Sequence, residues 1–110
     1  MNRKTQMQRL GQLSGLILDI RLSQLHAAAR ARVESQARLA GLDAPQASDL
    51  PPIAAAQAGL LYERWAEVRR AEINLLLSRQ TAVWLEAQTS ARQAFGRSEA
   101  VQSVQKKLCP

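Results

Sequence analysis

The chain has 110 residues, a formal net charge of +6 and an aromatic content of only 4%. A chain of this length forms one domain at most and buries a small core, which excludes a large enzyme-like core with a deep pocket. The single cysteine, Cys109, excludes a disulfide framework and a thiolate metal site. The excess of arginine attracts acidic proteins, nucleic acids and anionic lipids alike, so charge alone does not choose among these partners.

Residues 2–40 contain no proline and are expected to form a long amphipathic helix. Its expected apolar face consists of residues at three-, four- or six-residue steps: Leu18, Leu22, Leu25, Ala29, Val33 and Leu39. Gly11 and Gly15 weaken the first turns by about 1 kcal/mol each relative to alanine, and their spacing would permit close backbone approach. A signal peptide or membrane span is not favoured, because polar residues interrupt the leucines and no stretch approaches ~20 apolar residues.

Residues 41–52 are predicted to be a linker. Gly41 is expected to end the first helix in the left-handed conformation that glycine tolerates. Pro51 and Pro52 cannot lie inside a helix, although Pro52 can occupy a first turn with Ser48 or Asp49 helping to cap it. A short connection of this kind makes the flanking helices antiparallel.

Residues 53–108 are again free of proline and predict a second helix. One apolar stripe, expected to pack against the first helix, consists of Leu61, Trp65, Val68, Leu75 and Ala82. A second stripe, rotated from the first, consists of Trp84, Ala91, Phe95, Ser98, Val101, Val104 and Leu108. The rotation predicts a stutter near residues 75–84 or a change of packing partner. Trp65 is expected in the core, and Trp84 either in the core or at an interface.

The sequence therefore predicts an all-α fold, an antiparallel two-helix coiled-coil hairpin with a longer second helix. At 1.5 Å per residue the two helices would run about 58 and 82 Å. Placing Ala40 opposite Ala54 brings Asn2 opposite Arg92 and leaves everything from residue 93 onward without a partner in the chain. Such an overhang implies either another protein chain that covers its apolar and basic surface or a locally disordered tail. The residues expected to bind this partner are Trp84, Arg92, Phe95, Arg97, Val101, Val104, Lys106 and Lys107.

No residue pattern predicts catalysis, a cofactor, a metal or a small-molecule substrate, so we expect a protein that is not an enzyme. The single histidine, His26, has no catalytic partner nearby and is expected at the surface. Glutamate and arginine alternate in the second helix, where pairs such as Glu67 with Arg70 are expected to support it. No aromatic residues interleave with the arginines for base stacking, and no helix-turn-helix spacing occurs. Nucleic acid is therefore a less favoured partner than protein.

Three stretches together resemble the flagellar export protein FliJ family: RLGQLSGLILDIRLSQL at 9–25, YERWAEVRRAEINLLLSRQTAVW at 62–84 and EAQTSARQAFGRSEAVQSVQKKL at 86–108. The resemblance implies a long antiparallel coiled-coil hairpin that acts as the central stalk of a type III export ATPase. It implies insertion into the ATPase ring, contacts with the export gate and chaperones, and a cytoplasmic location, at most peripheral at the inner membrane face. The matching surfaces would be basic Arg92, Arg97, Lys106 and Lys107, and apolar Phe95, Val101 and Val104.

Two other hypotheses remain open at this point. A helical adaptor could self-associate through the overhang into a dimer or four-helix bundle. A basic nucleic-acid-binding protein would lose affinity steeply with salt. The sequence does not select the partner, the oligomeric state or the helix face that is bound.

Overall fold

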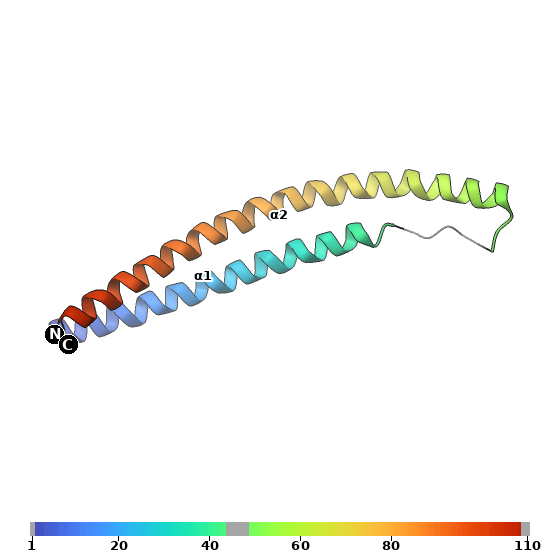
Figure 1. The fold of residues 1–110 in the computed structure, drawn as a ribbon. Coiled ribbons are helices and arrows are strands. Elements are labelled where there is room, and N and C mark those ends of the chain that lie inside the picture. The colour runs from blue at the N-terminus through green and yellow to red at the C-terminus, as the bar shows by residue number, and fades with distance from the viewer. Residues whose placement is uncertain (1, 44–48, 109–110) are drawn as a thin grey trace. The chain divides into compact units, whose positions relative to one another are not determined.

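The computed structural model describes residues 2–43 and 49–108. These residues form two antiparallel helices, α1 (Arg3–Ala40) and α2 (Pro52–Leu108) (Figure 1). The expected all-α hairpin with a longer second helix is confirmed, since α2 has 57 residues and α1 has 38. Each helix begins within one residue of the expected start.

The chain forms two compact units, each of which pairs a segment of α1 with a segment of α2. The first unit contains Met1–Ala29 and Ala82–Pro110, and the second unit contains Arg30–Thr81. The start of α1 and the end of α2 therefore belong to the first unit. The connection between the helices belongs to the second.

Local hydrogen bonds explain where α1 begins and ends. Asn2 Oδ1 accepts hydrogen bonds from the backbone N–H and the hydroxyl of Thr5, both at 2.8 Å, which is an N-cap. At the other end, the N–H groups of Leu42 and Asp43 donate to carbonyl groups three residues earlier, each at 3.2 Å. No residue in the described ranges has a positive φ, so the prediction of a left-handed Gly41 is wrong. A tight 3₁₀-type turn closes α1 instead.

α2 begins at a proline, a residue that suits the first turn of a helix. Pro52 is the first helical residue, where its missing N–H costs nothing. The carbonyl group of Pro51 accepts the first bond, from the N–H of Ala55, at 2.8 Å. Of the two expected caps, Ser48 lies outside the described residues.

The covered side chains of both helices follow the three-four spacing of a coiled coil, and we call these positions the seam. On α1 the seam comprises Met7, Gly11, Ser14, Leu18, Leu25, Ala28, Arg32, Ser35 and Leu39. On α2 it comprises Ala66, Arg70, Ile73, Leu77, Gln80, Trp84, Ala87, Ala91, Ala94, Ser98, Val101 and Gln105. The spacing on α2 continues without interruption through residues 75–84. The expected stutter is therefore wrong, and the two apolar stripes belong to different faces of α2.

The seam is made mostly of small and polar side chains. Its buried members are Ser14, Ala28, Ser35, Ala66, Ile73, Ala91, Ala94 and Ser98. Short side chains allow two helix axes to approach closely, which brings many atoms into contact without large residues. Ile73, at 3% exposure, is the one large apolar residue among them.

The stripe expected to pack against α1 faces outward instead. Leu61 is 66% exposed, and Trp65 is 56% exposed rather than part of the core. On α1 the expected apolar face is covered in part, since Leu18, Leu25, Ala29 and Leu39 are half-buried. Leu22 and Val33 are exposed. The size of a side chain was therefore a poor guide to which face meets the partner helix.

Two polar contacts set the register in the second unit. The Ser35 hydroxyl, which is 1% exposed, donates to Gln80 Oε1 at 2.6 Å. One turn away, Arg32 Nε donates to Thr81 Oγ1 at 3.1 Å. A polar pair buried between helices disfavours a shifted register, because shifting would leave its groups without partners.

This register moves the unpaired segment to the other end of α2. Counting about five residues in opposite directions from Ser35 and Gln80 brings Ala40 level with Leu75, not with Ala54. About 23 residues of α2, roughly 34 Å, therefore lie beyond the end of α1 (Figure 1). The Tyr62 hydroxyl donates to the carbonyl of Leu42 at 2.8 Å, so the chain leaving α1 continues along this segment.

The expected overhang after Arg92 is wrong. In the first unit, Gln105 Nε2 donates to the carbonyl of Met7 at 2.7 Å, and Ala94 and Ser98 are buried. The expected register assumed a tight connection between the helices. About eleven residues separate α1 from α2 and can span up to ~36 Å, so α2 can begin far beyond the end of α1.

The two glycines of α1 should respond differently to alanine. A Cβ atom on Gly11 would collide with the side-chain amide of Gln105, whereas nothing lies near Gly15. Gly15→Ala should therefore stabilise the protein by about 1 kcal/mol through helix propensity. Gly11→Ala should gain less, since it displaces Gln105 and costs about 1 kcal/mol of hydrogen bonding. Urea unfolding of both variants measures the difference.

The control experiment removes the side chain of Gln105, which lies against Gly11. In a Gln105→Ala background, Gly11→Ala should stabilise as much as Gly15→Ala does. Equal gains from both glycines in the unaltered background would mean that Gln105 does not reach Gly11.

Candidate protein-binding surfaces

Most large apolar side chains of both helices face away from the seam. Among the leucine, isoleucine, valine, tryptophan and phenylalanine residues of the described ranges, only Leu42 and Ile73 are buried. Isolated exposed apolar residues are normal on a protein surface, but a continuous exposed stripe marks a surface that another molecule covers.

One such stripe runs along α2 in the second unit, and we call it the outer stripe: Leu61, Trp65, Val68 and Leu75. These side chains are 56–66% exposed and recur at three-, four- or seven-residue steps, so they share one helix face. Val68 and Leu75 each follow a buried seam residue by two positions. Two positions correspond to about 200° around a helix, which places the outer stripe opposite the seam.

Charged residues continue and flank the outer stripe. Glu72 lies between Val68 and Leu75 in the helical spacing, and its carboxylate accepts a hydrogen bond from Arg69 Nη1 at 3.0 Å. Exposed pairs of this kind contribute little to stability, so both charges remain available to a partner. A partner of the outer stripe would therefore meet apolar side chains and, between Val68 and Leu75, the charged side chain of Glu72.

Arg70 lies on the seam side and is half-buried. The expected pairing with Glu67 is wrong, because Arg70 bonds to Glu63 at 3.2 Å and pairs with Asp43 at 3.6 Å. The hydrogen bond to Glu63 raises the pKa of Arg70 above its ordinary value. Arg70 therefore stays charged and ties Asp43, three residues past the end of α1, to α2.

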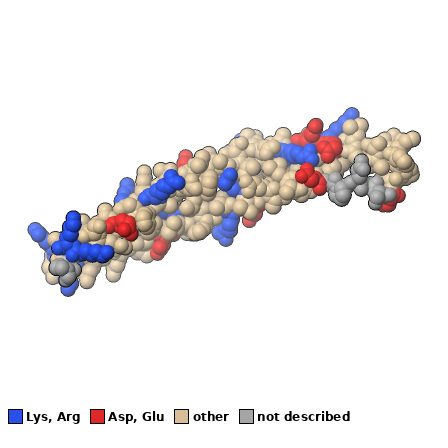
Figure 2. Space-filling model, in the orientation of Figure 1, with Lys and Arg blue, Asp and Glu red and all other residues tan. Residues whose placement is uncertain are grey.

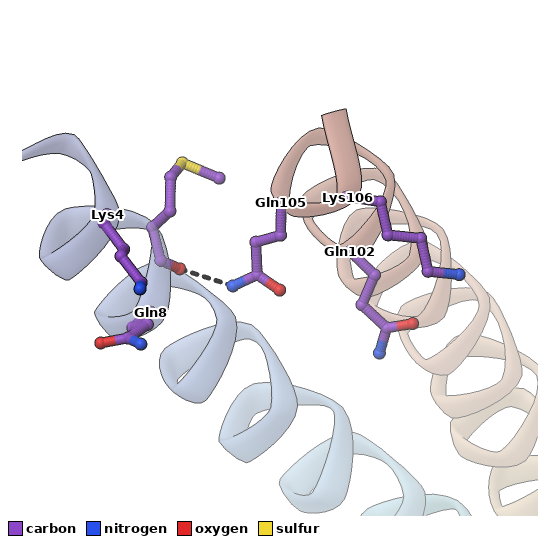
Figure 3. Close-up of a pocket in the computed structure, with 6 residues that line it drawn as sticks. Lys4, Gln8, Gln102, Gln105 and Lys106 are labelled. Atoms are coloured by element: carbon purple, nitrogen blue, oxygen red, sulfur yellow. Dashed lines mark hydrogen bonds between the residues drawn. The ribbon is translucent and has the colours of Figure 1, made fainter. Parts of the chain in front are cut away.

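A polar cleft lies between the first turns of α1 and the last turns of α2, in the first unit (Figure 3). It has a volume of about 490 Å³ and is lined by Lys4, Met7, Gln8, Gln102, Gln105 and Lys106. The Gln105 side chain reaches across it to the Met7 carbonyl. Amides and ammonium groups can donate hydrogen bonds and attract anions, but they lack the carboxylate or imidazole of a usual general base.

A second depression in the first unit is apolar, and we call it the apolar groove. Both helices line it: Leu10, Leu13, Ser14 and Ile17 from α1, and Ala94, Arg97, Ala100 and Val101 from α2. Its volume is about 370 Å³. The leucines at its α1 edge are exposed, with Leu13 at 54%.

The eight residues expected to bind a partner all lie on the paired part of α2 in the first unit. Trp84 and Val101 are half-buried at seam positions, whereas Arg92, Phe95, Arg97, Val104, Lys106 and Lys107 are exposed. Arg97 and Val101 contribute to the apolar groove, and Lys106 lines the polar cleft. The structure thus brings Arg97 and Val101 together with residues of α1 for which the sequence predicted no binding role.

The residues missed by sequence reasoning are the α1 edge of the groove, Leu10, Leu13 and Ile17. They precede the expected apolar face of the first helix, which begins at Leu18. A signal did exist, because small residues stand at positions separated by seven or a multiple of seven: Ala66, Ala87 and Ala94 in one series, and Ala91 and Ser98 in another. This spacing indicates which face of α2 forms the seam, and the remaining faces of the helix then point outward.

Groups that could carry other chemistry are sparse in the part of the chain that the structure describes. His26 is exposed, as expected. Within residues 2–43 and 49–108 no three His, Cys, Asp or Glu side chains come together as a metal site. Neither of the two described helices has the length and hydropathy needed to cross a membrane. Cys109 lies outside the described residues.

Comparison with known proteins found no match among protein-family models, curated proteins or solved structures. Function must therefore be argued from these surfaces and from the resemblance in the sequence.

Proposed function

We propose that this chain is a non-enzymatic stalk or adaptor of a flagellar or other type III secretion export ATPase. The resemblance to the FliJ family supports this, because its three stretches all lie within α1 and α2. An antiparallel hairpin with a longer second helix is the fold that the resemblance implies, and it is the fold of this chain.

The observation that carries the proposal is the outer stripe. Two helices alone leave Leu61, Trp65, Val68 and Leu75 in water, and a protein surface that covers them would recover their burial energy. The segment of α2 beyond the end of α1 carries most of this stripe. In this proposal that segment, rather than the C-terminal end, enters the ring of the ATPase.

The experiment is ATP hydrolysis by the export ATPase of the same organism, with and without the purified chain. Stimulation of hydrolysis supports the proposal. Neither stimulation nor co-purification with that ATPase would contradict it.

A variant of the outer stripe makes the test specific. Trp65→Ser should raise the concentration needed for half-maximal stimulation about 30-fold, since truncating a tryptophan anchor costs about 2 kcal/mol or more. Leu16→Ser, at a position that is 60% exposed in the first unit, is the matched control and should leave stimulation unchanged. Equal effects of the two variants would remove the outer stripe from the interface.

Self-association through the outer stripe is a second candidate, and charge favours it. Residues 30–81 carry seven basic and six acidic side chains, so two copies of this unit would not repel strongly. A two-fold dimer would pair the same stripe on both copies. Sedimentation should then show a dimer that Trp65→Ser converts to a monomer. A monomer at all concentrations would exclude this candidate.

A further inference from the structure

We infer that the apolar groove of the first unit binds an acidic amphipathic helix of another protein. The inference concerns a different surface from the outer stripe and does not depend on an export ATPase.

The shape of the groove fits a helix. Leu10, Leu13 and Ile17 form its α1 edge, with exposures of 46%, 54% and 38%. The opposite edge comes from Ala100 and Val101 of α2. A groove between two packed helices is the place where a third helix can insert its apolar side chains.

The floor of the groove carries little that would resist an apolar occupant. Ala94 is 3% exposed and Ser14 is 9% exposed. The Ser14 hydroxyl donates to the carbonyl of Gly11 at 3.0 Å, so its donor is already used within α1. Covering this floor therefore leaves no hydroxyl donor without a partner.

The length of the groove sets the length of the occupant. Leu10 and Ile17 are seven residues apart, which is about 10.5 Å along a helix. An occupant would therefore make its main contacts through two turns, with apolar residues at positions i, i+3 or i+4, and i+7.

Charge selects the kind of helix. The first unit carries eight basic and three acidic side chains, a net charge of +5, against +1 for the second unit. Figure 2 shows lysine and arginine gathered where α1 starts and α2 ends. Arg97 itself lines the groove. Acidic residues beside the apolar positions of the bound helix would be attracted by the positive charge of the first unit, whereas a second copy of the same unit would be repelled by it.

A helix also fits the groove better than an anionic membrane does. The floor residues Ala94 and Ser14 are buried below the exposed edge of Leu13. A flat surface would touch the edges and leave this floor uncovered, whereas the side chains of a helix can reach it.

The test uses the full chain and a fluorescent synthetic helical peptide with leucines at the stated spacing and glutamates beside them. A peptide with lysines in place of the glutamates is its control. Anisotropy should show that the acidic peptide binds at least 10-fold more tightly than the basic one, and more weakly as salt rises. Leu13→Ser should weaken binding at least 10-fold, and Arg97→Gln about 3-fold. Leu61→Ser, on the outer stripe, should have no effect, and circular dichroism checks that each variant stays helical.

Several results would overturn the inference. No binding of the acidic peptide, equal binding of both peptides, or unchanged affinity of Leu13→Ser would each do so. Binding to phosphatidylserine vesicles that Leu13→Ser abolishes, without peptide binding, would assign the groove to a membrane. Self-association that Leu13→Ser abolishes, again without peptide binding, would assign it to a second copy.

Discussion

Replacing Ile73 with alanine should lower the free energy of unfolding by about 2–5 kcal/mol. Ile73 is 3% exposed and is the one large apolar residue among the buried members of the seam. Its loss leaves a cavity, because the surrounding structure relaxes only partly around a truncated side chain. Urea unfolding followed by circular dichroism measures the change.

Leu75→Ala is the matched control. Leu75 lies two positions further on the same helix but is 57% exposed, so its truncation should change stability by less than about 0.5 kcal/mol. Both variants must be compared at a concentration where the protein is monomeric, since a partner copy could cover the outer stripe. If Leu75→Ala costs as much as Ile73→Ala, the wrong face of α2 has been assigned to the seam.

Enlarging a seam alanine should also destabilise the protein. Ala66 has no exposed surface, so Ala66→Leu must displace the atoms that cover it or force strained rotamers. We expect a loss of about 1–3 kcal/mol in the free energy of unfolding. The same urea experiment measures it.

Ala71→Leu provides the comparison, because Ala71 is exposed on the outward side of α2. Both changes add the same atoms and alter helix propensity equally, so Ala71→Leu should stay within about 0.5 kcal/mol of the unaltered protein. A stabilising Ala66→Leu would show that there is room for a large side chain at this position, which would contradict its complete burial.

The positions of the helices could be predicted from the sequence. The long proline-free segments, Gly41 after the first helix and Pro52 at the start of the second predict the bounds of both helices to within one residue at their starts. These signals are local, because backbone sterics decide them without reference to the partner helix.

The faces of the helices and their register could not be predicted in the same way. Hydrophobic periodicity favours the stripe with the largest apolar side chains, such as Leu61 and Trp65, but these residues face outward. Alanine and serine score weakly as apolar residues, yet their small size lets two helices approach closely. The register then follows from pairs such as Ser35 with Gln80, which are distant in sequence and carry no local signal.

The candidate surfaces could be predicted only in part. Arg97 and Val101 were expected to contact a partner, and they lie in the apolar groove, where binding remains to be tested. Leu10 and Leu13, which form the other edge, become part of the same surface only in a register that pairs the end of α2 with the start of α1. The overhang was expected at the wrong end because the length of the connection does not define where α2 begins along α1.

The most direct test of this register is nuclear Overhauser spectroscopy of the isotope-labelled monomer. We expect cross-peaks between the side-chain amide of Gln105 and the α-protons of Gly11, which the contact across the seam requires. A sample that mixes labelled and unlabelled chains shows that they arise within one chain. Cross-peaks that instead place Arg92 beside Asn2, with none between Gln105 and Gly11, would contradict the register and the seam built on it.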